Sequence, residues 1–203
     1  KHLDVCMKYD FQAAMIAPCY ISLAKDVLKG TGIQVASTLN FPQANDTLDM
    51  KLAALKEMIK TGVDQFDFPP NPGLLIGGEE KAYFEEMKQI VEVAHASGVI
   101  VKSMLEFGFL NEEQKKKAAQ LACEAGIDWV KQSSGWGVGG CAATVEDVKI
   151  LKENISLPCR VKVSGKVNSL EKMKMMFEAG AELVGTSSGP EIIEGLIGDP
   201  NAY

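Results

Sequence analysis

The sequence predicts a (β/α)8 barrel, also called a TIM barrel, whose first βα unit is missing or truncated at the N-terminus. The main observation is a repeated unit in which a charged, helix-periodic stretch ends at a glycine and a short apolar run follows. Glycine commonly ends helices because it adopts the left-handed conformation without a Cβ clash. Helix, glycine and strand in alternation are typical of helices around a parallel sheet. The glycines of this unit are Gly62, Gly98, Gly126 and Gly180.

Seven strands and the helices between them follow from this pattern. The expected strands cover residues 13–17, 33–40, 65–69, 99–106, 127–133, 159–164 and 182–187. Two helix starts carry capping residues, Asn111 with Gln114 and Thr144 with Asp147. Seven strands are one short of a closed barrel, and residues 1–9 resemble the end of a helix, so the first strand would lie upstream. The alternative architecture is an open, doubly wound sheet.

Composition limits the class of protein. The 203 residues read as a single domain, 1–203, and the 46% hydrophobic content can form a core, which excludes a disordered chain. No apolar run approaches the roughly 20 residues of a membrane span. The net charge of −6 and the lack of a basic run argue against a nucleic-acid partner. Five cysteines without a C-x-x-C pair indicate reduced thiols and a cytoplasmic location. Since only two histidines occur, we expect no metal site that depends on histidine ligands. We expect no cofactor.

Charged residues near the carboxyl ends of the expected strands are the candidates for chemistry. These are Asp67, Lys102, Glu106, Lys131 and Lys162. A single lysine in a parallel strand can simply extend to solvent at the strand end. Three lysines on consecutive strands would instead bring their charges together, and each ammonium disfavours the charged form of its neighbour. A neutral amine can form a Schiff base with an aldehyde, and a carboxylate can move protons, so Lys131, Lys162 and Asp67 predict a metal-free class I carbon–carbon lyase.

Two glycine-rich loops are candidates for binding substrate. Residues 135–140 match G-x-G-x-x-G, but three residues separate them from the next helix cap, so a flexible loop beside a small ligand is favoured over a dinucleotide site. Residues 185–190 lead into the last helix, where backbone N–H groups can bind phosphate. A plain turn with an N-cap is the alternative for the second loop. The candidate binding residues in these loops are Gly135, Gly185, Ser187 and Ser188.

Several stretches resemble the deoxyribose-phosphate aldolase family. These are LAKDVLKGTG, NFPQANDTLD, CEAGIDWVKQSSGWGVGGCAATVEDV, RVKVSGK and EAGAELVGTSSG, which together span most of residues 21–195. The most specific are the W-V-K-x-S-S-G strand and the V-K-x-S-G strand after it. The resemblance implies a (β/α)8 barrel that reversibly cleaves 2-deoxy-D-ribose 5-phosphate to acetaldehyde and D-glyceraldehyde 3-phosphate.

The resemblance also implies a role for each candidate residue. Lys131 would form the Schiff base, Lys162 would perturb it, and Asp67 would relay protons. Lys102 and Glu106 would lie in the polar network beneath these residues. Some members of the family use a terminal tyrosine in proton transfer, which makes Tyr203 a candidate for that step.

The chain departs from the family at the phosphate pocket. Family members usually have G-G-[IV]-R after the second lysine, whereas this chain has Gly165, Lys166, Val167 and Asn168. The resemblance thus adds Gly165 and Lys166 as candidate phosphate-binding residues, with Lys166 in the role of the missing arginine. The expected partner is therefore a small phosphorylated aldehyde or sugar, and we also expect a homo-oligomer, either a dimer or a tetramer. Two alternatives remain: a Schiff-base aldolase for a different or non-phosphorylated sugar, and a non-catalytic barrel that binds phosphate compounds.

Overall fold

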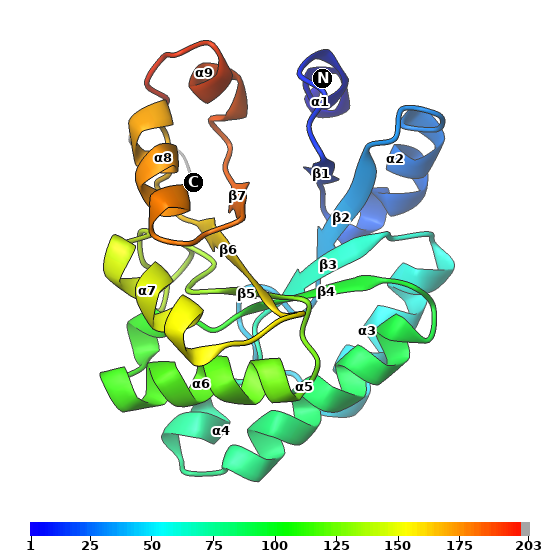
Figure 1. Cartoon of the computed structure of the whole chain (residues 1–203). Helices are drawn as coiled ribbons and strands as arrows, with labels where there is room; N and C mark the ends of the chain where they lie inside the picture. The colour runs from blue at the N-terminus through cyan, green and yellow to red at the C-terminus, as the bar shows by residue number, and fades with distance from the viewer. Residues whose placement is uncertain (200–203) are drawn as a thin grey trace.

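The computed structural model describes residues 1–199, which form one curled sheet with helices around its outer face (Figure 1). All strands are parallel and lie side by side in chain order, from β1 to β7. The strands are β1 (Ala13–Met15), β2 (Gln34–Thr38), β3 (Gln65–Phe68), β4 (Ile100–Met104), β5 (Trp129–Lys131), β6 (Arg160–Ser164) and β7 (Leu183–Gly185).

Helices alternate with the strands, as expected for βα units. The α-helices are α1 (His2–Lys8), α2 (Ile21–Val27), α3 (Leu48–Lys60), α4 (Pro72–Ile76), α5 (Glu80–His95), α6 (Glu112–Glu124), α7 (Val145–Asn154), α8 (Leu170–Glu178) and α9 (Gly189–Ile193). Two short 3-10 helices, η1 (Pro18–Tyr20) and η2 (Phe107–Phe109), lie in the loops after β1 and β4. No helix within residues 1–199 is both long and apolar enough to span a membrane.

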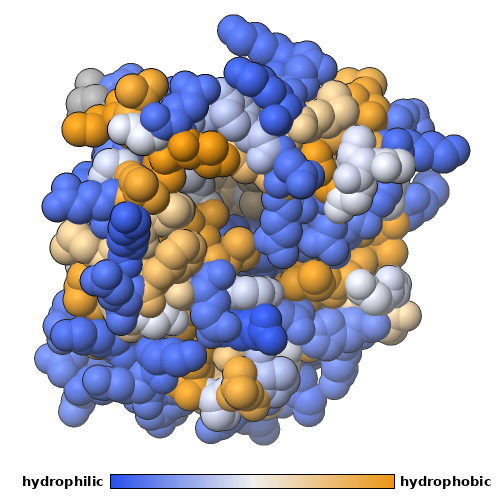
Figure 2. Space-filling model, turned by 45° about the horizontal axis from the view of Figure 1, so that its top comes forward, coloured by the Kyte–Doolittle hydropathy of each residue, from blue (hydrophilic) through white to orange (hydrophobic). Residues whose placement is uncertain are grey.

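The sequential strand order confirms a barrel-type sheet. A doubly wound sheet reverses its strand order in the middle, and this sheet does not, so that alternative was wrong. Within the described residues β1 and β7 are the two edges of the sheet and do not pair with each other. Figure 2 shows a hollow in the surface, with hydrophobic residues on one side of it and hydrophilic residues on the other. An eighth strand upstream of α1 stays a prediction.

The local signals in the sequence are also confirmed. All seven expected strands form, but each is shorter than expected by one to four residues because pairing stops where the loops begin. The four helix-ending glycines have φ between +71° and +114°, which other residues rarely adopt. Asn111 and Gln114 form a reciprocal capping box, and the Thr144 side chain accepts a hydrogen bond from the backbone N–H of Asp147.

The two faces of the sheet have different compositions. Successive side chains on a strand point to opposite faces. One set packs against the helices and is apolar and fully buried, as for Phe66, Val101 and Val161. The other set faces the inside of the barrel and includes the charged residues of the strands. The core thus lies between sheet and helices, and the polar chemistry lies inside the sheet.

A buried ion pair joins two loops at the carboxyl ends of the strands. Lys51 on α3 has no exposed surface, and its Nζ lies 2.9 Å from Glu86 Oε1 on α5. The same ammonium donates to the carbonyl of Ala44, in the loop after β2, at 2.7 Å. Glu86 Oε1 accepts the backbone N–H of Asn71, in the loop after β3, at 2.9 Å. This Lys51–Glu86 pair therefore fixes both loops to the helical layer.

Candidate active site

The register of the strands brings four charged side chains to the inside of the barrel. Asp67 on β3 pairs with Lys102 on β4, and Lys131 on β5 pairs with Lys162 on β6. Lys102 pairs with Trp129, two residues before Lys131, so both lysines lie on the same face of the sheet. The sequence could place these residues only on strands, whereas the register places them on one face.

The carboxylate of Asp67 contacts all three lysines. Its Oδ2 accepts a hydrogen bond from Lys162 Nζ at 2.5 Å and lies 3.1 Å from Lys131 Nζ. Its Oδ1 faces Lys102 Nζ at 3.8 Å and accepts no hydrogen bond. Exposed fractions are 1% for Asp67, 2% for Lys102, 3% for Lys131 and 5% for Lys162. The candidate site is thus a buried cluster of one carboxylate and three amines.

The cluster perturbs the protonation of Asp67. Burial by itself would raise the pKa of this carboxyl group, because low polarity disfavours the charged form. The charges of Lys162, Lys131 and Lys102 outweigh burial and hold the pKa of Asp67 well below its usual range. Asp67 is therefore ionised at every pH at which an enzyme normally works.

The pKa of Lys102 is lowered, whereas pairing with a carboxylate ordinarily raises the pKa of a lysine. Burial lowers the pKa of Lys102 to about 7, and the charges of Lys162 and Lys131 act in the same direction while Asp67 opposes them. Its ammonium also donates a hydrogen bond to Oε1 of Gln65, which lies two residues before Asp67 on β3. One carboxylate cannot neutralise three buried ammonium groups, and loss of a proton from a lysine relieves the excess charge.

Glu106 lies apart from the contacts of Asp67 and binds the glycine-rich loop after β5. Its Oε2 accepts the hydroxyl of Ser133 at 3.1 Å, and its Oε1 accepts the backbone N–H of Ser134 at 3.0 Å. Burial raises the pKa of Glu106, although these hydrogen bonds oppose the shift. Ser133 Oγ in turn accepts the N–H groups of Gly135 and Cys141. Glu106 and Ser133 therefore hold both ends of the loop.

Three of the candidate binding residues line one cavity of about 300 Å³, next to the loop after β5. These are Gly135, Gly165 and Lys166; the other lining residues are Trp136, Gly140, Cys141 and Ala142. Gly165 has φ +94°, and a Cβ there would lie 2.7 Å from the carbonyl oxygen of Cys141. Lys166 has φ +60°, a backbone conformation that residues other than glycine rarely adopt.

The other three candidate binding residues lie on the neighbouring loop after β7. Gly185 is next to Lys162, since a Cβ there would lie 3.1 Å from its Cε. Ser187 is exposed, whereas Ser188 is buried. The Thr186 hydroxyl donates to the carbonyl of Val167 at 2.7 Å and joins this loop to the one that carries Lys166.

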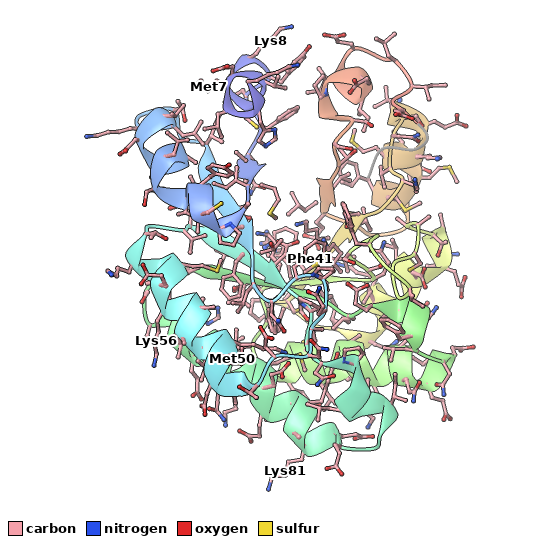
Figure 3. The ribbon with its side chains drawn as sticks, turned by 180° about the vertical axis from the view of Figure 1, so that it is seen from behind. Met7, Lys8, Phe41, Met50, Lys56 and Lys81 are labelled. Carbon is pink, nitrogen blue, oxygen red and sulfur yellow. The ribbon has the colours of Figure 1, made fainter. Side chains whose placement is uncertain are left out.

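An aromatic contact joins two loops across the carboxyl ends of the strands. The ring of Phe41, in the loop after β2, meets Trp136, in the loop after β5, edge to face at 6.2 Å between centroids. Figure 3 shows Phe41 in the middle of the view, while Lys56 on α3 and Lys81 on α5 point away from the barrel. Trp136 is both half-exposed and part of the cavity lining, so this contact lies at its border.

Sequence reasoning did not identify two polar residues next to the cluster. Gln65 is buried and contacts Lys102, and its Nε2 donates to Gln34 Oε1 on β2 at 2.5 Å. A signal for Gln65 was present, because residues two apart on a strand share a face and Gln65 precedes Asp67 by two. Nothing in the sequence pointed to Gln34.

Two further expectations concern Tyr203 and a metal site. Tyr203 lies outside the described residues. Among residues 1–199, no three His, Cys, Asp or Glu side chains gather in a way that could hold a metal ion.

Comparison with curated proteins gives relatives that share one name. The chain is 38% identical over 197 residues to the deoxyribose-phosphate aldolase of Thermococcus kodakarensis, and this alignment covers 96% of this chain and 87% of that protein. It is 40% identical over 200 residues to the deoxyribose-phosphate aldolase of Staphylococcus carnosus, covering 98% of this chain and 89% of that protein. No protein-family model matches the chain.

Solved structures agree with these relatives. The chain superposes on the tetrameric deoxyribose phosphate aldolase of Aeropyrum pernix with a TM-score of 0.85 and 25% identity, covering 95% of this chain and 80% of that one. The aldolase QR15 matches with a TM-score of 0.87 and 29% identity, covering 95% and 84%. The parallel sheet in sequential order and the relatives at 38–40% identity over nearly the whole chain lead to one conclusion: this chain belongs to the deoxyribose-phosphate aldolase family.

Proposed function

We propose that this chain is a class I aldolase that reversibly cleaves 2-deoxy-D-ribose 5-phosphate to acetaldehyde and D-glyceraldehyde 3-phosphate. The observation that carries the proposal is the buried cluster in which Lys131 and Lys162 both lie within 3.1 Å of Asp67 Oδ2. Family membership supports the same reaction.

Lys131 is the proposed nucleophile. Its neutral amine attacks the C1 aldehyde of the open-chain sugar, and loss of water gives an imine, that is, a Schiff base. Asp67 is ionised and hydrogen-bonded to Lys162, and it takes the proton of the C3 hydroxyl through water and Lys162. As that proton leaves, the C2–C3 bond breaks, the imine takes up the electron pair as an enamine, and glyceraldehyde 3-phosphate departs. Protonation of the enamine at C2 and hydrolysis release acetaldehyde and restore Lys131.

Gly135, Gly165, Lys166, Gly185, Ser187 and Ser188 are the proposed phosphate-binding residues. Three of them line the 300 Å³ cavity, and Lys166 supplies a positive charge there. A lysine ammonium is a point charge without the two-pronged geometry of arginine, so it orients phosphate less strictly. We therefore infer a preference for phosphorylated sugars that is weaker than an arginine would give.

Assembly and location are inferred with this function. We infer a homo-oligomer, a dimer or a tetramer, because the Aeropyrum pernix relative is described as tetrameric. Exposed apolar side chains at Tyr20, Leu23 and Val27 are suited to such contacts. Light scattering would give the mass. We place the reaction in the cytoplasm because all five cysteines are unpaired.

Trapping the imine tests the proposal most directly. Incubation with acetaldehyde and borohydride adds one reduced two-carbon group, which we expect on the peptide that contains Lys131. Lys131→Ala is expected to abolish both the adduct and cleavage. Lys174→Ala, which alters an exposed lysine on α8, is the matched control and is expected to change neither. A protein without any adduct would be the non-catalytic barrel, and an adduct that persists in Lys131→Ala would refute the assignment of the nucleophile.

A further inference from the structure

The inside of the barrel contains a chain of hydrogen bonds that the reaction does not directly require. It runs from Gln34 on β2 to Gln65 on β3 and on to Lys102 on β4, whose ammonium faces Asp67 Oδ1. Gln65 and Asp67 are two residues apart on one strand, so their side chains share a face. The register pairs Lys102 with Asp67 across the neighbouring strand. Gln65 therefore contacts Lys102 from the same strand as Asp67, two residues nearer the start of β3.

The ammonium of Lys102 and the amide of Gln34 together fix the orientation of the Gln65 amide. Gln65 Nε2 donates to Gln34 Oε1 at 2.5 Å, which leaves Gln65 Oε1 to face Lys102. An amide oxygen accepts a hydrogen bond from an ammonium, whereas an amide NH2 would repel it. Gln65 is 3% exposed, so water does not readily replace either contact.

We propose that Gln65 is a positioning residue for Asp67: supported by its hydrogen bond to Gln34, it holds Lys102 against Asp67 Oδ1 and leaves Oδ2 to Lys131 and Lys162. This inference rests on the proposed role of Asp67 in cleavage. Asp67 Oδ1 accepts no hydrogen bond, so the charge of Lys102 at 3.8 Å is what orients that oxygen. A Lys102 that moved away would free the carboxylate to rotate.

Gln65 also influences the charge of Lys102, because it is a neutral acceptor. The charged groups that act on Lys102 are Asp67 on β3, Lys131 on β5, Lys162 on β6 and Asp128 just before β5. Together with burial they give the pKa of about 7. A carboxylate in place of the amide would favour the ammonium, and an apolar side chain would disfavour it. Substitutions at position 65 are therefore expected to shift the titration of Lys102 in opposite directions.

The experiment compares Gln65→Glu, Gln65→Leu and Gln34→Leu by two measurements. NMR of protein labelled with 13C at lysine Cε follows the titration of Lys102, whose signal is assigned by its loss in Lys102→Met. The pH dependence of kcat/KM for cleavage is recorded beside it. Because the charge of Lys102 orients Asp67, kcat/KM is expected to fall as Lys102 loses its proton, which gives the rate profile a limb at the Lys102 midpoint. We expect this midpoint and this limb to rise by about one unit in Gln65→Glu. Both are expected to fall in Gln65→Leu and, by less, in Gln34→Leu.

Controls separate this proposal from a general defect in folding. Gln89→Glu makes the same chemical change on the exposed face of α5 and is expected to move neither midpoint nor limb. Gln34→Leu combined with Gln65→Leu is expected to shift no further than Gln65→Leu, since Gln34 acts through Gln65. Shifts in the same direction in Gln65→Glu and Gln65→Leu would overturn the proposal, and so would a Lys102 titration that moves without the rate limb. A wild type that forms no adduct with acetaldehyde would refute the proposed function instead, while the Lys102 titration would still decide the role of Gln65.

Discussion

Removing the ammonium of Lys51 tests whether the buried pair with Glu86 stabilises the fold. In Lys51→Met, a side chain of similar length replaces a residue with no exposed surface. Glu86 then remains as a buried charge whose other partner is the backbone N–H of Asn71, and the carbonyl of Ala44 loses its donor. Breaking a buried ion pair by removing one partner costs about 3–5 kcal/mol. For a chain of this size, each kcal/mol lowers Tm by about 2–4 °C, so we expect a fall of roughly 6–20 °C.

Thermal and guanidinium unfolding at pH 7, followed by circular dichroism, measure this effect. Lys56→Met on the same helix is the matched control, because Lys56 is exposed and lacks a buried partner, and we expect a change of less than about 0.5 kcal/mol. The variant with both Lys51→Met and Glu86→Leu leaves no buried charge. We expect its loss of stability to be smaller than the sum of the two single losses. A loss below about 1 kcal/mol in Lys51→Met, or strict additivity in the double variant, would refute the reasoning.

Three further predictions concern the barrel interior and the loops. In Lys166→Ala, the ratio of kcat/KM for deoxyribose 5-phosphate to kcat/KM for free deoxyribose is expected to fall about ten-fold or more. The reason is that a hydrogen bond to a charged group contributes about 1.5–3 kcal/mol. An unchanged ratio would contradict a contact between Lys166 and the phosphate. Folding lowers the pKa of Asp67, so the unfolded chain binds a proton at this residue before the folded chain does. The free energy of unfolding is therefore expected to decrease as the pH falls below about 4. Asp67→Asn is expected to flatten that decrease in acid unfolding curves. Gly139→Ala is expected to reduce kcat/KM more than Val138→Ala, because a Cβ at 139 would overlap the ring of Phe109 while Val138 is 93% exposed. Equal rates in the two variants would show that the loop can move without loss of activity.

The sequence by itself determined the order of the secondary-structure elements and the residues that could carry out the chemistry. Glycines after helices, capping residues and short apolar runs are local signals, and a local signal depends only on neighbours in the chain. They were sufficient to predict seven parallel strands and to identify Asp67, Lys131 and Lys162 as a set. The family resemblance added a role for each of these residues, and the comparisons confirmed the family.

Only the tertiary structure decided which polar groups meet. Register is a long-range property, so it alone placed Lys102 beside Asp67 and brought Gln34 and Gln65 into the same chain of hydrogen bonds. The separation of Glu106 from the contacts of Asp67 follows from the loop after β5, whose N–H and hydroxyl groups satisfy its carboxylate. The protonation of Asp67 and Lys102 was equally inaccessible from the sequence, because a pKa depends on burial and on charges from strands far apart in the chain.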